Sequence, residues 1–268
     1  MNNISRIHPL DLHEIRSRVA IRLGLKELAS CARVSQDWND SFTPILYNFV
    51  VLKKPGGPSM ESVENNKHLI QRLSIKTSVY GGVPWSYAVY KLICSLMTNS
   101  HLADLKMEYN YIGDNGVIEL FDALKTNSTL NMLNLASNAI GDDGAAALSE
   151  ALKTNSTLTT LILASNIVGV DGAAALSDAL KTNSTLTTLD LHDNRVEDNG
   201  AVALSEALKA NSTLTTLILK TSFIGPNGAI ALSEALKINS TLTILDLQYN
   251  EIGDNGAVAL NNVGFLQK

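Results

Sequence analysis

The sequence is poor in cysteine, with only Cys31 and Cys94 among its 268 residues. Two thiols cannot form the dense disulfide framework on which small secreted domains depend. Each of the two stands in an apolar stretch with helical character. We therefore expect two buried, reduced thiols and a reducing compartment.

Long apolar runs are also missing. No segment approaches the ~20 apolar residues that a membrane-spanning helix needs, and the opening MNNISRIHPLDLHEIRSR has no apolar signal core. Aromatic residues make up only 5% of the chain, so the core must be aliphatic. These features predict an intracellular protein, in the cytoplasm or the nucleus, without a membrane partner.

Basic residues are too few for a nucleic-acid-binding face. The chain has 21 Lys and Arg against 26 Asp and Glu, a net charge of -5. Residues 1–54 hold 8 basic and 5 acidic residues, net +3, so the remainder has 13 against 21, net -8. Nucleic-acid recognition needs a basic surface, and an acidic body argues against it.

What the sequence has in abundance is repetition. The pattern L-x-x-L-x-L-x-x-N recurs six times at a spacing of 28 residues, beginning at Leu102, Leu130, Leu158, Leu186, Leu214 and Leu242. Leucines two residues apart lie on the same face of a β-strand. Each copy therefore predicts one short strand with its leucines buried.

Each copy continues with a helical pattern. An Asn or Asp followed by glycine precedes an alanine-rich run that keeps Ala and Leu at helical spacing. An Asn or Asp before such a run is a typical helix N-cap. We predict that role for Asn115, Asp143, Asp171, Asn199, Asn227 and Asn255, and a unit of strand, turn, helix and turn.

Asparagine recurs at two further positions of the unit. The one that closes L-x-x-L-x-L-x-x-N is expected to satisfy backbone groups where the strand ends, because an amide both donates and accepts. Copy five has Ser222 there, and we predict a looser turn filled by water. The N-S-T asparagines are expected to end the helices in the left-handed conformation, without glycans, at Asn127, Asn155, Asn183, Asn211 and Asn239.

The six phased copies closely resemble ribonuclease-inhibitor-like leucine-rich repeats, over roughly residues 100–260. A weaker copy with Ile70, Leu73, Ile75 and Ser78 precedes them. The fold class implied is α/β: a curved leucine-rich-repeat solenoid with parallel inner strands and outer helices. Its units bury their leucines by stacking, and the wider spacing of helices bends the stack with its strands inside.

The variable letters of each copy point to a binding face. Side chains between and after the strand leucines face the inner curve, and they change most from copy to copy. Grouped exposed aliphatics suggest a protein contact, although single ones can also reflect strand propensity. The candidate partner-binding residues are Asp104, Lys106, Glu108, Tyr109, Met132, Asn134, Thr160, Ile162, Thr188, Asp190, His192, Asp193, Thr216, Ile218, Lys220, Ile244, Asp246, Gln248 and Tyr249.

The same residues offer little for catalysis. Asp190, His192 and Asp193 could hold a metal or a general base, but an open sheet lacks the pocket and supporting shell that such chemistry needs. The chain has no Gly-rich phosphate loop and no nucleophile motif. We expect no enzyme activity, no metal and no cofactor.

The first fifty residues lack the sequence pattern of the repeats. Apolar residues at helical spacing and the string LASCARVSQDW resemble an F-box, with His13 where the family usually has proline. The resemblance implies docking to a Skp-type adaptor of a cullin ubiquitin ligase. Trp38 would lie in the module's own core, and the docking surface would consist of Leu10, Leu12, Ile15, Val19, Leu23, Leu28 and Val34.

These observations predict an all-α F-box-like module at 1–52, a Pro/Gly linker at 53–60, an atypical first repeat at 61–101, and six repeats with a partial C-terminal cap at 102–268. An alternative to the partial cap is that the chain is a shortened form of a longer array. The expected function is a ubiquitin-ligase substrate receptor that is monomeric apart from its partners. Alternatives are a repeat scaffold whose head only caps the first repeat, and a regulator like the Ran-type GTPase activators.

Overall fold

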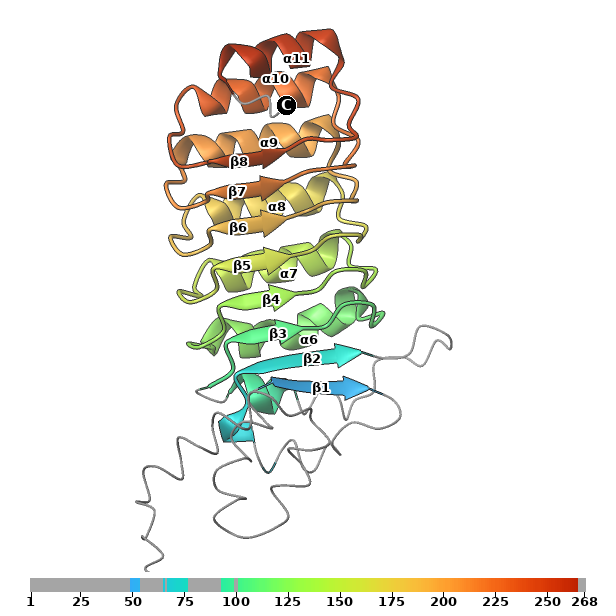
Figure 1. Cartoon of the computed structure of the whole chain (residues 1–268), viewed down its shortest axis with the longest axis vertical. Helices are drawn as coiled ribbons and strands as arrows, with labels where there is room; N and C mark the ends of the chain where they lie inside the picture. The colour runs from blue at the N-terminus through green and yellow to red at the C-terminus, as the bar shows by residue number, and fades with distance from the viewer. Residues whose placement is uncertain (1–48, 54–64, 66, 77–92, 99–100, 265–268) are drawn as a thin grey trace, which may run out of the picture.

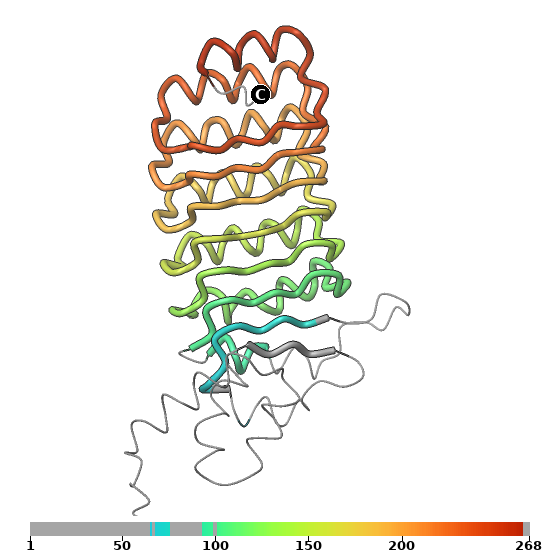
Figure 2. The backbone as a smooth tube through the Cα atoms, in the orientation of Figure 1, coloured from blue at the N-terminus to red at the C-terminus, as the bar shows by residue number. Residues whose placement is uncertain are grey.

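The computed structural model describes residues 49–53, 65, 67–76, 93–98 and 101–264. Eight parallel strands form one sheet in the order β1 to β8, and the helices α6 to α11 cover one of its sides (Figure 1). The chain rises through the molecule one turn after another, in sequence order (Figure 2). This is the predicted curved solenoid of parallel strands and outer helices.

From β3 on, each repeat supplies one strand and one helix. The strands are β1 Phe49–Lys53, β2 Arg72–Lys76, β3 Asp104–Lys106, β4 Met132–Asn134, β5 Thr160–Ile162, β6 Thr188–Asp190, β7 Thr216–Ile218 and β8 Ile244–Asp246. The helices are the 3-10 helix η1 Lys67–Leu69 and α6 Gly113–Thr126, α7 Asp142–Leu152, α8 Val170–Leu180, α9 Glu197–Ala210, α10 Pro226–Leu236 and α11 Gly253–Asn262. From β3 to β8 each residue pairs with the residue 28 positions later.

The sheet begins earlier than the sequence suggested. Strand β1 pairs with β2, with Phe49 opposite Arg72. Residues 49–52 therefore belong to the sheet and not to the helical module, which is consistent with the high strand propensity of the run FVVL. The rest of that module, its adaptor-facing residues and linker residues 54–60 lie outside the described residues.

The core is a continuous column of aliphatic side chains between strands and helices. The repeat leucines are almost entirely buried, and so are Ile70, Leu73 and Ile75 of the weak first copy. Residues 93–97 are helical, with Ile93 and Leu96 buried and Cys94 half-buried against this core. Because each unit packs on its neighbours, no repeat completes its core alone.

The predicted N-caps are wrong. Asp143 and its equivalents lie within the first helical turn, are exposed, and make no side-chain cap bond. The cap comes from the preceding repeat: Asp142 accepts from the backbone N–H groups of Gly169 (2.7 Å) and Gly172 (2.8 Å) at the start of α8. Asp114 and Asp198 do the same for α7 and α10.

This capping bond decides the backbone conformation at the helix start. Where the preceding repeat has an aspartate at the position of Asp142, the first residue of the next helix start, which we call the leading residue, has negative φ, as at Gly169 (φ -98). Where it supplies Val170 or Pro226 instead, the leading residue of the next repeat is left-handed, at Glu197 (φ 55) and Gly253 (φ 60). Glu197 therefore occupies a conformation that favours glycine.

One asparagine ladder closes the carboxyl ends of the strands. Asn166 accepts from the backbone N–H groups of Asn138 (2.9 Å) and Ile140 (3.0 Å), and its amide donates to carbonyls of its own and the preceding repeat. The turn at Ser222 is not looser: Thr221 (φ 53) matches Asp193 (φ 55). Ser222 is fully buried and donates to the Leu191 carbonyl at 3.1 Å.

A second asparagine ladder closes the opposite edge. Asn155 donates to the Leu124 carbonyl at 2.8 Å and accepts from the Leu158 N–H at 2.8 Å, and its equivalents repeat this pattern. The predicted left-handed conformation is wrong, since Asn127 and Asn211 are extended, with φ -68 and -77. The nitrogen that a glycan would require is already engaged in hydrogen bonds inside the protein.

Candidate protein-binding face

The strands position two rows of side chains on the sheet surface opposite the helices. Within β3 to β7 the central residue is buried and the two flanking residues are half-exposed. The in-register pairing aligns them into a first row of Asp104, Met132, Thr160, Thr188, Thr216 and Ile244, and a second row of Lys106, Asn134, Ile162, Asp190, Ile218 and Asp246.

The other candidate residues follow the strands. Glu108, His192 and Lys220 are half-buried and Gln248 is exposed, while Tyr109, Asp193 and Tyr249 occupy the left-handed turn position and are exposed. We name all of these rows together the strand face. It carries five carboxylates, Asp104, Glu108, Asp190, Asp193 and Asp246, against the two lysines Lys106 and Lys220, a net charge of -3.

Asp190 is the most perturbed carboxyl of the strand face. It stands between Ile162 and Ile218 in its row. Burial raises the pKa of Asp190 above its ordinary value; the hydrogen bond from the His192 N–H (2.9 Å) and the charge of His192 oppose this, and the charge of Asp246 adds to it. The Asp190 carboxylate thus has a structural role, because it fixes the backbone at His192.

Two further polar contacts organise the ends of the face. The Glu108 carboxylate accepts from the Asn134 amide at 2.8 Å. The Lys220 ammonium lies 4.9 Å from the centre of the Tyr249 ring. Among the described residues, no three His, Cys, Asp or Glu side chains gather as metal ligands would, and no described helix has the length and hydropathy of a membrane span.

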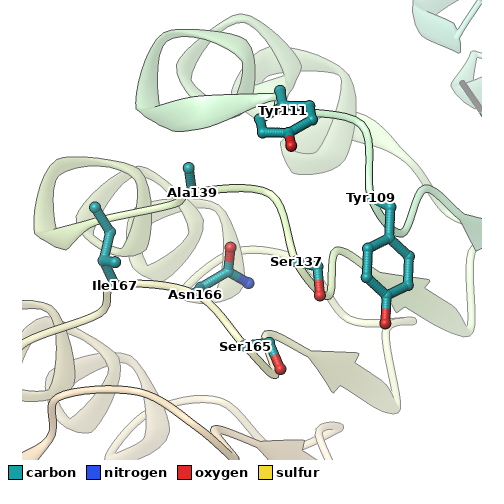
Figure 3. Close-up of a pocket in the computed structure, with 7 residues that line it drawn as sticks. All are labelled: Tyr109, Tyr111, Ser137, Ala139, Ser165, Asn166 and Ile167. Carbon is teal, nitrogen blue, oxygen red and sulfur yellow. The ribbon is translucent and has the colours of Figure 1, made fainter. Parts of the chain in front are cut away.

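A cleft of about 310 Å³ opens where strands β3 to β5 end (Figure 3). Its walls come from three successive repeats, and its lining residues are Tyr109, Tyr111, Ser137, Ala139, Ser165, Asn166 and Ile167. Tyr111, Ser137 and Ala139 share the left-handed conformation of Tyr109. The strand face therefore continues onto this edge of the solenoid.

The sequence pattern predicted Tyr109 and Tyr249 on this edge as binding residues but not Tyr111, Ile167 and Phe223. Of the eleven exposed large apolar residues in the described part, five lie on it: Tyr109, Tyr111, Ile167, Phe223 and Tyr249. The sequence does contain a sign of this edge. The residue that follows the strand-closing asparagine, or Ser222 in copy five, is aromatic or aliphatic at Tyr111, Ile167 and Phe223. It was overlooked because period-2 alternation assigns faces only within the strand.

Comparison with known proteins agrees with this geometry. A protein-family model described as "Leucine Rich repeat" matches residues 98–121, 126–149, 154–177, 182–205 and 239–260. A search of curated proteins finds no match.

Two solved structures are similar to this chain. The leiomodin-1 actin-binding site 2 is 27% identical, with a TM-score of 0.48 over 54% of this chain and 85% of that chain. A chain in the crystal structure of the yeast Rad7 and Elc1 complex is 16% identical, with a TM-score of 0.53 over 87% of this chain. This chain covers 64% of that one. The five segments matched by the family model are leucine-rich repeats, and the strands of the repeats form the candidate binding face.

Proposed function

We propose that the chain is a protein-recognition module whose strand face holds a client protein. The observation that supports this most is the contrast within each repeat. Positions that build the core and the two asparagine ladders are nearly constant, while the strand-face positions vary more, apart from the run Thr160, Thr188 and Thr216. An open, acidic surface with interspersed aliphatic side chains suits a protein partner better than a small substrate.

We further propose that the client is presented to a ubiquitin ligase, with no catalytic step performed by this chain. Support comes from the F-box-like pattern of residues 10–38, in which Leu12 and Ile15 would dock on a Skp-type adaptor. The yeast fold neighbour was crystallised in complex with Elc1, but a likeness at that identity concerns the fold alone. The regular outer helices are also those expected of the ribonuclease-inhibitor-like class.

Co-purification of the full chain with a Skp-type adaptor tests the ligase link. We expect a stable complex that is lost in Leu12→Asp and in Ile15→Asp, with the melting temperature of the repeats unchanged. A head that only caps the first repeat gives the opposite pattern: no complex with the wild type, and repeats destabilised by both substitutions. That pattern would leave a repeat scaffold without ligase linkage.

A further inference from the structure

The edge cleft exists because two repeats carry small side chains between two larger walls. Tyr109 and Tyr111 of one repeat form the first wall, and Ile167 forms the second (Figure 3). Between them lie Ser137, Ala139 and Ser165. Most other repeats have larger residues at these positions, namely tyrosine, aspartate or threonine at that of Ser137 and Ser165, and tyrosine, isoleucine, arginine, phenylalanine or glutamate at that of Ala139. The cleft therefore depends on the residues at variable positions of the repeat and not on the residues that recur in every copy.

The walls of the cleft are apolar and open to solvent. Tyr109, Tyr111 and Ile167 are 60%, 64% and 51% exposed. Neighbouring exposed aromatic and aliphatic groups gain free energy when a partner covers them, and tyrosine is a common anchor of protein interfaces. The volume of about 310 Å³ is at the small end of ligand sites, which suits one or two side chains of a polypeptide.

A carboxylate residue of the strand face stands directly before the first wall in the chain. Glu108 precedes Tyr109 in the chain, and its Oε1 accepts from the Asn134 amide. Its other oxygen, Oε2, is buried and has no hydrogen-bond partner among the described residues. Because solvent does not reach Oε2, the carboxylate acts on a partner through its charge and not through a direct hydrogen bond. The net charge of -3 on the strand face favours a basic partner as well.

We propose that the cleft binds a peptide segment of the client with an aliphatic or aromatic residue next to arginine or lysine. The apolar side chain enters between Tyr111 and Ile167, and the cation lies over the acidic strand face, where the negative charge of Glu108 attracts it. This proposal rests on the proposed protein-recognition function and names the chemistry of the segment that is recognised.

A peptide array with the purified full chain tests the proposal. The peptides have a Gly-Ser background and a central pair that combines leucine, phenylalanine or serine with arginine, glutamine or glutamate. We expect leucine–arginine and phenylalanine–arginine to bind at least about tenfold more tightly than serine–glutamate. Equal binding of all pairs, or a preference for glutamate, would overturn the proposal.

Two substitutions connect the selectivity to the cleft. Ala139→Tyr fills it with a residue that the framework already accepts, since Tyr111 occupies the equivalent position with φ 51 against 57. It should reduce binding of the leucine–arginine peptide about tenfold, whereas the matched control Thr221→Tyr, outside the cleft, should not. Glu108→Gln removes one negative charge next to the first wall, so it should weaken the preference for arginine over glutamine and keep that for leucine over serine. Selectivity unchanged in both variants would refute the assignment.

The adaptor experiment separates failure of this inference from failure of the proposed function. Adaptor binding without peptide selectivity leaves the ligase receptor intact and removes the cleft from it. Peptide selectivity that depends on the cleft, without adaptor binding, keeps the recognition site and removes the ligase. Because all variants contain the full chain, the melting temperature of each one reports whether it is folded.

Discussion

Ser222→Asn should stabilise the protein by repairing one gap in the asparagine ladder. Asn138, Asn166 and Asn250 accept from the N–H groups of Ile112, Ile140 and Ile224 respectively. The corresponding N–H of the buried Val196 finds no acceptor among the described residues, because the serine hydroxyl is too short. Restoring one buried hydrogen bond, and removing the cost of the unpaired donor, contributes about 1–2 kcal/mol.

Thermal unfolding of the variant measures this directly. A gain of about 1–2 kcal/mol raises the melting temperature by roughly 2–8 °C for a domain of this size, and hydrogen exchange at the Val196 amide should slow. The matched control is Asn166→Ser, which creates the same gap in another repeat and should destabilise by a similar amount. A Ser222→Asn protein that melts at or below the wild type would refute the reasoning.

Three further substitutions test other parts of the account. Asp142→Ala removes the acceptor of two N–H groups in the next repeat and should lower the free energy of unfolding in urea by about 1–2 kcal/mol. Asp143→Ala, on the exposed helix turn, should lower it by less than about 0.5 kcal/mol. Equal losses in the two variants would contradict capping between repeats. Glu197→Gly relieves a left-handed residue and should gain about 1 kcal/mol; a loss in the same urea titration would argue against strain there. Burial raises the pKa of Asp190, so its ionisation lowers stability as pH rises above the ordinary aspartate value of about 3.9. Asp190→Asn, the residue type found at Asn134 in the same row, should therefore raise the melting temperature near neutral pH and lose this advantage below that value; a constant difference across pH would contradict it.

The repeat period was enough to predict the strands, the helices and the column of buried leucines. Side chains of a strand alternate between its two faces, so Leu189 and Leu191 are both buried only when their shared face points to the core. The constant spacing of 28 residues between copies then sets neighbouring strands in register. The strand-face rows follow from the same alternation, and for that reason their positions were predictable residue by residue.

The capping of the helices was not predictable in this way. A local rule assigned the N-cap to Asp143, but the bond that forms reaches from Asp142 across 27 residues to Gly169. Such a contact depends on how closely two units stack, and a single unit contains no signal for it. The cleft was missed for the same reason, because its lining combines residues of three successive repeats.

The most direct test of protein recognition on the strand face is site-specific photo-crosslinking in cells. A photoreactive residue at Ile162 or Ile218 on the strand face is compared with one at Ile118 or Val202, which are exposed on α6 and α9. The account predicts that one defined protein crosslinks from both strand-face positions and from neither helix position. Crosslinking of that protein only from the helices, or equally from both faces, would contradict it.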